Sequence, residues 1–108
     1  MNLLVFDIGA RFTKLGFAGE SEPRYILPSP KPPKMRQVSV SGGRTPQDES
    51  DIKLVPPNYK NWYETYVDFI ANIYQDNLQC NTADFSVILL EDLEWSYSQK
   101  RAILNIFL

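Results

Sequence analysis

The N-terminal stretch contains three short, β-prone runs separated by Gly and Pro. The runs are Leu3–Phe6, Phe12–Leu15 and Tyr25–Leu27; Gly9 lies between the first two and Pro28 closes the third. Short runs bounded by turn residues are typical of strands joined by hairpins, so the stretch predicts a meander of three antiparallel strands. Because the first run is apolar on both faces, we expect its strand at the centre of a covered sheet.

The first hairpin brings chemistry-bearing residues to one edge of this predicted sheet. Asp7 ends the first apolar run, Gly9 follows in the turn, and Lys14 lies on the returning strand. Backbone N–H groups in such a turn can hold a phosphate, and a carboxylate beside them can hold a hydrated magnesium ion. For the bare hairpin, a purely structural turn is the favoured interpretation, because Gly and Asp recur freely in turns.

A longer pattern extends this hairpin. Its letters, D-I-G-A-R-F-T-K-L-G-F-A-G-E over residues 7–20 and E-P-R-Y-I-L-P-S over residues 22–29, resemble the opening of the actin family. In that family the first hairpin is a phosphate loop of an ATP site. The resemblance implies that Asp7 faces the metal through water, that Lys14 faces the phosphates, and that Gly9 belongs to the same nucleotide-binding turn.

Two residues of the turn depart from the actin pattern. Ala10 stands where actins carry a serine hydroxyl, and Arg11 stands where they carry a second glycine. Ala10 cannot donate a side-chain hydrogen bond, and Arg11 lacks the freedom of Gly to adopt a positive φ. We therefore expect a vestigial or weak nucleotide site, no enzymatic activity and no cofactor on this chain, and ATP with magnesium stays open for a longer form.

Composition argues against several classes of function. The net charge of -2 disfavours a nucleic-acid surface held by phosphate contacts. The chain has no His and a single cysteine, Cys80, so it lacks the usual zinc ligands and an internal disulfide. Cys80 is expected to be an inert thiol near a helix end. The N-terminal apolar run is too short for a signal peptide or a membrane span. We therefore expect no membrane partner and a location in the cytoplasm or nucleus, and the net charge leads us to expect no nucleic-acid partner.

The middle of the chain changes abruptly in composition. Residues 30–34 form a basic, proline-rich segment, for which a solvated connection is favoured over a ligand for a proline-binding groove. Arg36–Val40 and Ile52–Val55 predict short strands, and Gly42–Ser50 predicts a mobile loop between them. Actins carry a longer segment here, which contacts the next subunit of a filament. The shorter segment of this chain therefore argues against ordinary actin-like polymerisation through this end.

A long helix is predicted after this segment. It is expected to begin near Asn58 or Asn61, because Asn61 with Glu64 three residues later fits a capping box. Apolar residues then recur at spacings of three and four, which predicts a helix face packed against the sheet. These residues are Trp62, Tyr66, Phe69, Ile70, Ile73 and Tyr74. The helix is expected to end around residues 77–81.

One more strand and one more helix are predicted in the C-terminal part. Ser86–Leu90 is continuously apolar after its first residue, which is typical of a strand buried on both faces. The acidic residues that follow favour a solvated loop over a metal site, because no histidine accompanies them. Ser96 with Gln99 fits the cap of a final helix. The acidic residues of the loop are Glu91, Asp92 and Glu94. The predicted helix has Ala102, Ile103, Ile106 and Phe107 on its apolar face, and Lys100 and Arg101 on its solvent side.

The order of three strands, helix, strand and helix is an α/β pattern. By resemblance it implies that residues 1–108 form an incomplete first subdomain of the actin, or ribonuclease-H-like, fold, with a Pro-rich loop at about residues 30–57. The resemblance also implies that the second phosphate loop, the adenosine pocket and the residue that positions the attacking water lie beyond Leu108. Catalysis needs these groups together around the reacting phosphate, so we expect no ATPase activity from this chain.

Within the actin family, the shortened middle segment, the altered turn and the Gly16–Glu20 motif most resemble the actin-related subunit at the pointed end of the dynactin filament. The resemblance implies a noncatalytic, cytoplasmic and cytoskeletal protein whose partners are the dynactin filament and the other pointed-end subunits, in dynein-driven transport along microtubules. Two alternatives stay open: an ATP-binding actin-like protein, and a nuclear actin-related subunit of a chromatin-remodelling complex.

Overall fold

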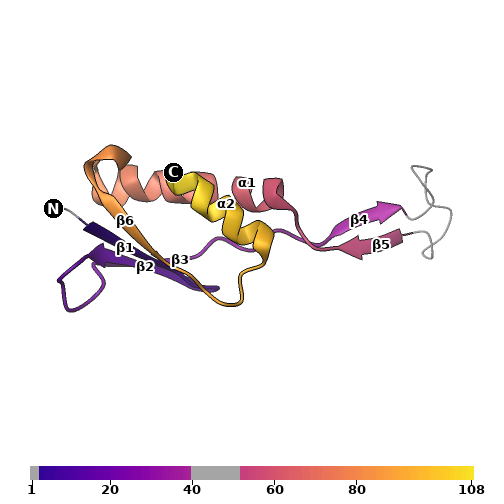
Figure 1. Cartoon of the computed structure of the whole chain (residues 1–108), viewed down its shortest axis with the longest axis horizontal. Coiled ribbons are helices and arrows are strands. Elements are labelled where there is room, and N and C mark those ends of the chain that lie inside the picture. Colours follow the sequence, from indigo (N-terminus) through magenta and orange to yellow (C-terminus); the bar gives the residue numbers. More distant parts are fainter. Residues whose placement is uncertain (1–2, 40–51) are drawn as a thin grey trace.

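The computed structural model describes residues 3–39 and 52–108. Within them the chain forms a four-stranded sheet, a two-stranded ribbon and two α-helices (Figure 1). The sheet contains β1 (Leu3–Ile8), β2 (Phe12–Phe17), β3 (Tyr25–Pro28) and β6 (Ser86–Leu90); the ribbon contains β4 (Arg36–Ser39) and β5 (Ile52–Val55); the helices are α1 (Tyr59–Asn72) and α2 (Tyr97–Phe107). The predicted α/β class is confirmed.

The sheet has the strand order β3-β2-β1-β6. β1 pairs antiparallel with β2, β2 pairs antiparallel with β3, and β6 runs parallel to β1 on its other side. Parallel strands need a long crossover, and α1 lies in the connection that supplies it. The predicted meander, the central position of the first strand and the order helix, strand, helix are therefore confirmed.

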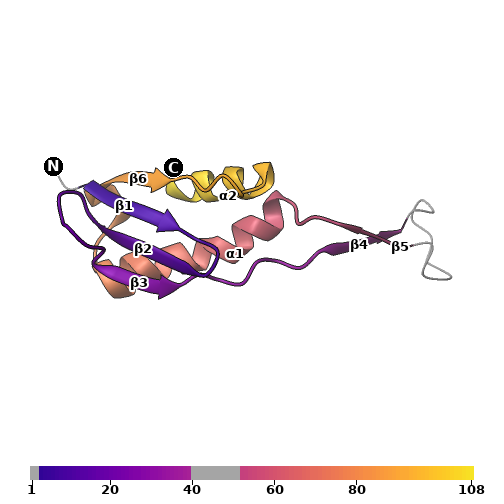
Figure 2. The ribbon, with the colours of Figure 1, turned by 90° about the horizontal axis from the view of Figure 1, so that it is seen from below.

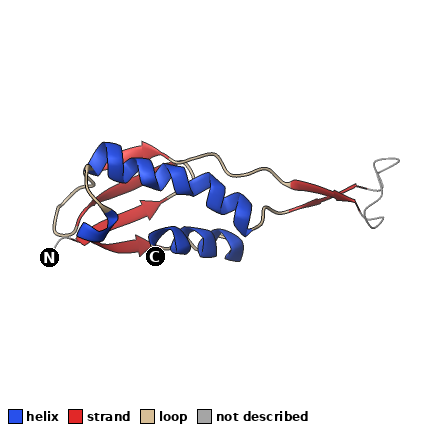
Figure 3. Ribbon diagram, turned by 90° about the horizontal axis from the view of Figure 1, so that it is seen from above, coloured by secondary structure: helices blue, strands red, loops and turns tan. Residues whose placement is uncertain are grey.

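Both helices cover the same face of the sheet (Figures 2 and 3). Alternate residues of β1 point to this face, so Leu4, Phe6 and Ile8 are fully buried against the helices. The apolar stripes of α1 and α2 complete the core, as the helical spacing predicts. The buried hydrophobic residues are Leu4, Phe6, Ile8, Leu15, Trp62, Tyr66, Ile70, Ile73, Tyr74, Ala102 and Ile103.

The opposite face of the sheet is left open by the described residues. On β6, Ile88 and Leu90 are 42% and 47% exposed, so the prediction that this strand is buried on both faces is wrong. On β1, Asp7 is exposed and Val5 is only half-buried, so the expectation of a sheet covered on both faces is wrong as well. The reason is geometric: successive residues of a strand face opposite sides, and the helices cover one side only.

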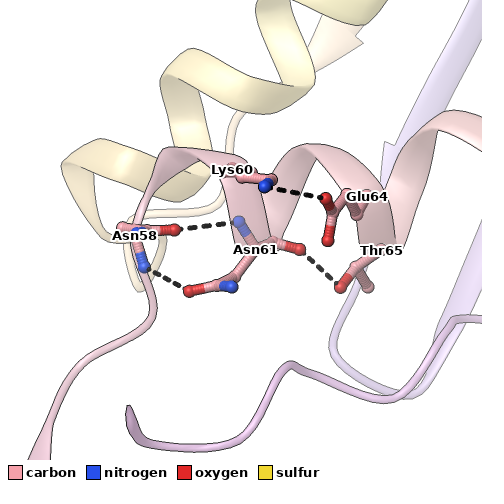
Figure 4. A network of polar contacts seen from close by, with 5 residues as sticks. All are labelled: Asn58, Lys60, Asn61, Glu64 and Thr65. Atoms are coloured by element: carbon pink, nitrogen blue, oxygen red, sulfur yellow. Dashed lines mark hydrogen bonds and ion pairs between the residues drawn. The ribbon is translucent and has the colours of Figure 1, made fainter.

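Helix α1 begins one turn earlier than the predicted capping box (Figure 4). The Asn58 side chain accepts from the Asn61 N–H, and the Asn61 side chain accepts from the Asn58 N–H, both at 3.0 Å. Glu64 instead forms an ion pair with Lys60, at 3.9 Å. Asn58 is therefore the N-cap, which confirms one of the two predicted starts of the helix. The predicted capping box of Asn61 with Glu64 is wrong.

The predicted end of the first helix and the predicted start of the second are both found in the structure. α1 continues as a π-helical turn (Ile73–Leu78) that stops at Gln79, whose φ of 52° is left-handed. A short 3-10 turn (Thr82–Asp84) then leads to β6. Ser96 caps α2 by accepting from the Gln99 N–H at 3.2 Å, as predicted. Among the described helices, none has the length and apolar character that crossing a membrane requires.

The β4–β5 ribbon extends away from the rest of the molecule (Figure 1). The chain measures 58 × 23 × 21 Å and has a radius of gyration of 17.5 Å, whereas a compact chain of this length has about 13 Å. Both strands were predicted from the sequence, although Val40 lies outside the described residues. The predicted mobile loop Gly42–Ser50 also lies outside them.

Candidate functional site

The turn between β1 and β2 is closed by its own backbone. The Gly9 N–H donates to the Phe12 carbonyl at 3.0 Å. A Cβ atom on Gly9 would lie 2.8 Å from that carbonyl oxygen, a distance that real Cβ atoms do not reach. Gly9 is therefore needed for a close approach of backbone. Its φ is not positive, and neither is that of Arg11, so the turn does not use the conformational freedom that Arg11 was expected to lack.

A small polar network fastens the turn to the end of β3. The Ser29 hydroxyl donates to the Gly9 carbonyl at 2.8 Å, and the Ser29 N–H donates to the Arg11 carbonyl at 2.8 Å. Since the Ser29 proton is already engaged, the Thr13 hydroxyl must donate to Ser29 Oγ, 2.7 Å away. Thr13 is fully buried, so this network fixes the turn from inside.

Removing the Ser29 hydroxyl is expected to destabilise the protein. In Ser29→Ala the buried Thr13 hydroxyl and the Gly9 carbonyl lose their partner, which should lower the free energy of unfolding by about 2 kcal/mol. Urea denaturation followed by circular dichroism measures the loss. Ser21→Ala, in the exposed β2–β3 loop, is the matched control and should change stability by less than about 0.5 kcal/mol. Equal losses in the two variants would contradict a structural role for the network.

Asp7 and Lys14 are brought together by strand pairing. They occupy directly opposite positions on β1 and β2 and lie on the open face of the sheet. Both line a pocket of about 440 Å³ that the β2–β3 loop and Leu90 complete. Gly9, the third predicted site residue, does not line it. No ion pair joins Asp7 to Lys14 within the residues that the structure describes.

The pocket is more acidic than basic. Glu20 and Glu22 of the β2–β3 loop line it beside Asp7, and Lys14 is its one basic lining residue among the described positions. Arg24 pairs with Glu20 at 2.7 Å and lies over the Phe17 ring, 4.5 Å from its centroid. The loop turns at Gly19, whose φ of 93° favours glycine. This charge balance attracts a cation and repels a bare polyphosphate.

The turn fits a phosphate group poorly. The Gly9 N–H is already used by Phe12, and Ala10 has no side-chain donor. The turn therefore offers few of the donors that a phosphate loop needs.

The other predicted positions have structural partners. Glu91 pairs with Lys100 at 2.8 Å, and Asp92 accepts from the Glu94 N–H at 2.9 Å. Within the described residues no group of acids, histidines or cysteines could hold a metal ion. Cys80 follows the left-handed Gln79 at the helix end. Partial burial, with the Asp84 carboxylate nearby, raises the pKa of its thiol, which keeps the group protonated at neutral pH.

A second hollow, of about 570 Å³, lies between α1, β6 and the C-terminal end of α2. It is lined mostly by apolar side chains, among them Ile70, Val87 and Ile106. Sequence reasoning found neither this hollow nor the network of Thr13 and Ser29. The only local signal for the network was a polar residue, Thr13, at a core position of β2.

Models of known protein families give no match to the chain. A curated relative, Actin-related protein 10 of Dictyostelium discoideum, is 26% identical over 104 residues, which cover 83% of this chain and 22% of the relative. The chain is similar to an actin-related protein. It spans about a fifth of the length of that relative.

Proposed function

We propose that this chain is part of a noncatalytic actin-related subunit that works by assembly with other proteins. The closed turn carries the proposal: its Gly9 N–H is engaged by Phe12, and Ala10 offers no hydroxyl. Phosphoryl transfer needs donors held in place around the phosphates, and this turn has few to offer. The similarity to an actin-related protein supports the family side of the proposal.

The finer proposal is that the subunit caps the pointed end of the dynactin filament, in dynein-driven transport along cytoplasmic microtubules. It is supported by the resemblance of the Gly16–Glu20 motif and by the short segment between Ser29 and Asn61. The exposed apolar residues of the open sheet face, such as Ile88 and Leu90, suit a protein that buries them in an assembly. Its partners would be the filament and the other pointed-end subunits.

One observation favours the second candidate function, an ATP-binding actin-like protein. Asp7 and Lys14 are directly opposed and line the same pocket, as a metal-facing acid and a phosphate-facing lysine would. In this alternative the groups that complete the ATP site come from a longer form of the protein, and Asp7 would hold magnesium through water.

Co-purification separates these functions. We would tag the full natural product that contains this sequence in its own cells and identify its partners by mass spectrometry. Recovery of dynactin filament and pointed-end subunits is the expected result. Recovery of chromatin-remodelling subunits would support the nuclear alternative, and recovery of no stable partner would contradict assembly as the function.

ATP binding by the same full-length protein is expected to be undetectable. Isothermal titration calorimetry with ATP and Mg²⁺ measures this binding directly. We expect none because the Gly9 N–H is already engaged and the pocket is acidic. Lys14→Ala removes the basic residue that lines the pocket in the described part of the chain, and Lys60→Ala is the matched control on α1. Binding that Lys14→Ala abolishes and Lys60→Ala preserves would replace the noncatalytic proposal with the ATP-binding alternative.

A further inference from the structure

The β4–β5 ribbon has a different chemistry on each face. Its register places Val38 opposite Lys53 and Gln37 opposite Leu54. Because side chains alternate along a strand, Arg36 shares a face with Lys53, whereas Ile52 and Leu54 share the other face. The first face therefore carries two cations beside Val38 and Val55, and the second carries its two apolar residues beside the uncharged Gln37 and Ser39. The sheet and helices cover neither face (Figures 1 and 2).

The charge of the ribbon is opposite to that of the body. We define the basic arm as residues 30–39 and 52–57, which contain four basic residues and no acidic one; the sequence between these two ranges adds three acidic residues and one basic residue, so residues 30–57 as a whole keep a positive net charge. Outside residues 30–57 the chain carries ten acidic and six basic residues. The four basic residues of the arm are Lys31, Lys34, Arg36 and Lys53. An acidic molecule is therefore attracted to the arm and repelled by the body.

The basic arm lacks the packing that a small sheet normally needs. An isolated two-stranded hairpin is marginally stable in water, whereas a third strand or a packed helix stabilises it. Among the described residues, no third strand pairs with β4 or β5. Met35 is 51% exposed and Leu54 is 56% exposed. Both observations leave the ribbon with strand edges and apolar side chains that a further strand can cover.

We propose that the basic arm binds an extended, acidic segment of a partner protein, which adds to the ribbon as a third strand. Alternate residues of an added strand face opposite sides. The segment should therefore alternate acidic residues, which meet Arg36 and Lys53, with apolar residues, which extend the face of Ile52 and Leu54. This inference rests on the proposed function, because it names the surface and the partner chemistry through which assembly occurs.

A carbodiimide crosslinker tests the partner directly, because it joins lysine amines to carboxylates in contact without a spacer. It is applied to the assembly purified with the full natural protein from its own cells. The expected result is crosslinks from Lys31, Lys34 or Lys53 to Asp or Glu in an alternating acidic and apolar segment of another protein. Crosslinks only to carboxylates of this chain or of a second copy would overturn the proposal, and so would binding that nuclease treatment abolishes.

Charge reversal separates this inference from the proposed function. Arg36→Glu with Lys53→Glu is expected to reduce crosslinks from Lys31 and Lys34, and recovery of the crosslinked partner, at least tenfold. Lys60→Glu with Lys100→Glu makes the same change of net charge on the body and should retain both; circular dichroism checks that each variant folds. Full recovery with the arm variant would overturn the inference and leave the proposed function standing. If the unaltered protein recovers no partner, both are wrong.

Discussion

Replacing Phe6 by alanine is expected to lower the free energy of unfolding by about 4 kcal/mol. Phe6 is fully buried in the centre of the sheet. Its ring contacts the Phe107 ring edge-on, with centroids 4.9 Å apart, and lies 6.0 Å from the Tyr74 ring. Truncation therefore leaves a cavity between the sheet and both helices. A domain of this size is stable by about 5–15 kcal/mol, so the loss is a large part of the total.

Phe12→Ala is the matched control for this prediction. It removes the same side chain from β2, where Phe12 is 54% exposed, and should lower stability by less than about 1 kcal/mol. Urea denaturation at equilibrium, with identical slopes for the variants, measures both. If the two losses were equal, the helix-covered face would not be the hydrophobic core of this protein.

Gly9→Ala is expected to lower stability by about 3 kcal/mol. The new methyl group would meet the Phe12 carbonyl at 2.8 Å, so the hairpin must open and its Gly9–Phe12 hydrogen bond must lengthen. Overpacking of this kind costs about 1–3 kcal/mol, and the weakened hydrogen bond adds about 1 kcal/mol. The Ser29 hydroxyl, which donates to the Gly9 carbonyl, would lose its geometry as well.

Gly19→Ala provides the comparison for Gly9→Ala. A Cβ on Gly19 meets no atom within 4 Å, so only its positive φ opposes the substitution, at about 1 kcal/mol. Denaturation ranks the two variants, and hydrogen exchange of the amides of Thr13 and Ser29 locates the damage. Faster exchange at these amides is expected in Gly9→Ala only. A larger loss in Gly19→Ala would show that conformation, rather than close approach, is what the glycines provide.

Local rules account for much of what was predicted correctly. The meander follows from turn residues between short runs, and the start of α2 follows from Ser96 and Gln99. The start of α1 shows the limit of such rules, because two asparagines three residues apart can each serve as a cap. In the fold, the reciprocal hydrogen bonds between Asn58 and Asn61 make Asn58 the cap, a pairing that the spacing of Asn61 and Glu64 did not reveal.

The candidate site was predictable in part. Asp7 and Lys14 were expected on neighbouring strands, and their directly opposite positions follow once the length of the turn sets the register. The acidic lining could not be foreseen, because Glu20 and Glu22 reach the pocket only through the path of the β2–β3 loop. The closure of the turn depends on Ser29, which is distant from Gly9 in sequence.

The sequence by itself determined the elements, their order and the chemistry available in the turn, since these depend on residue spacing over a few positions. Only the tertiary structure decided that one face of the sheet stays open, that β6 exposes Ile88 and Leu90, and that Ser29 reaches Gly9. The physical reason is that the pattern of apolar residues along a strand shows which residues can be buried. Whether they are buried depends on the packing of segments far apart in the chain.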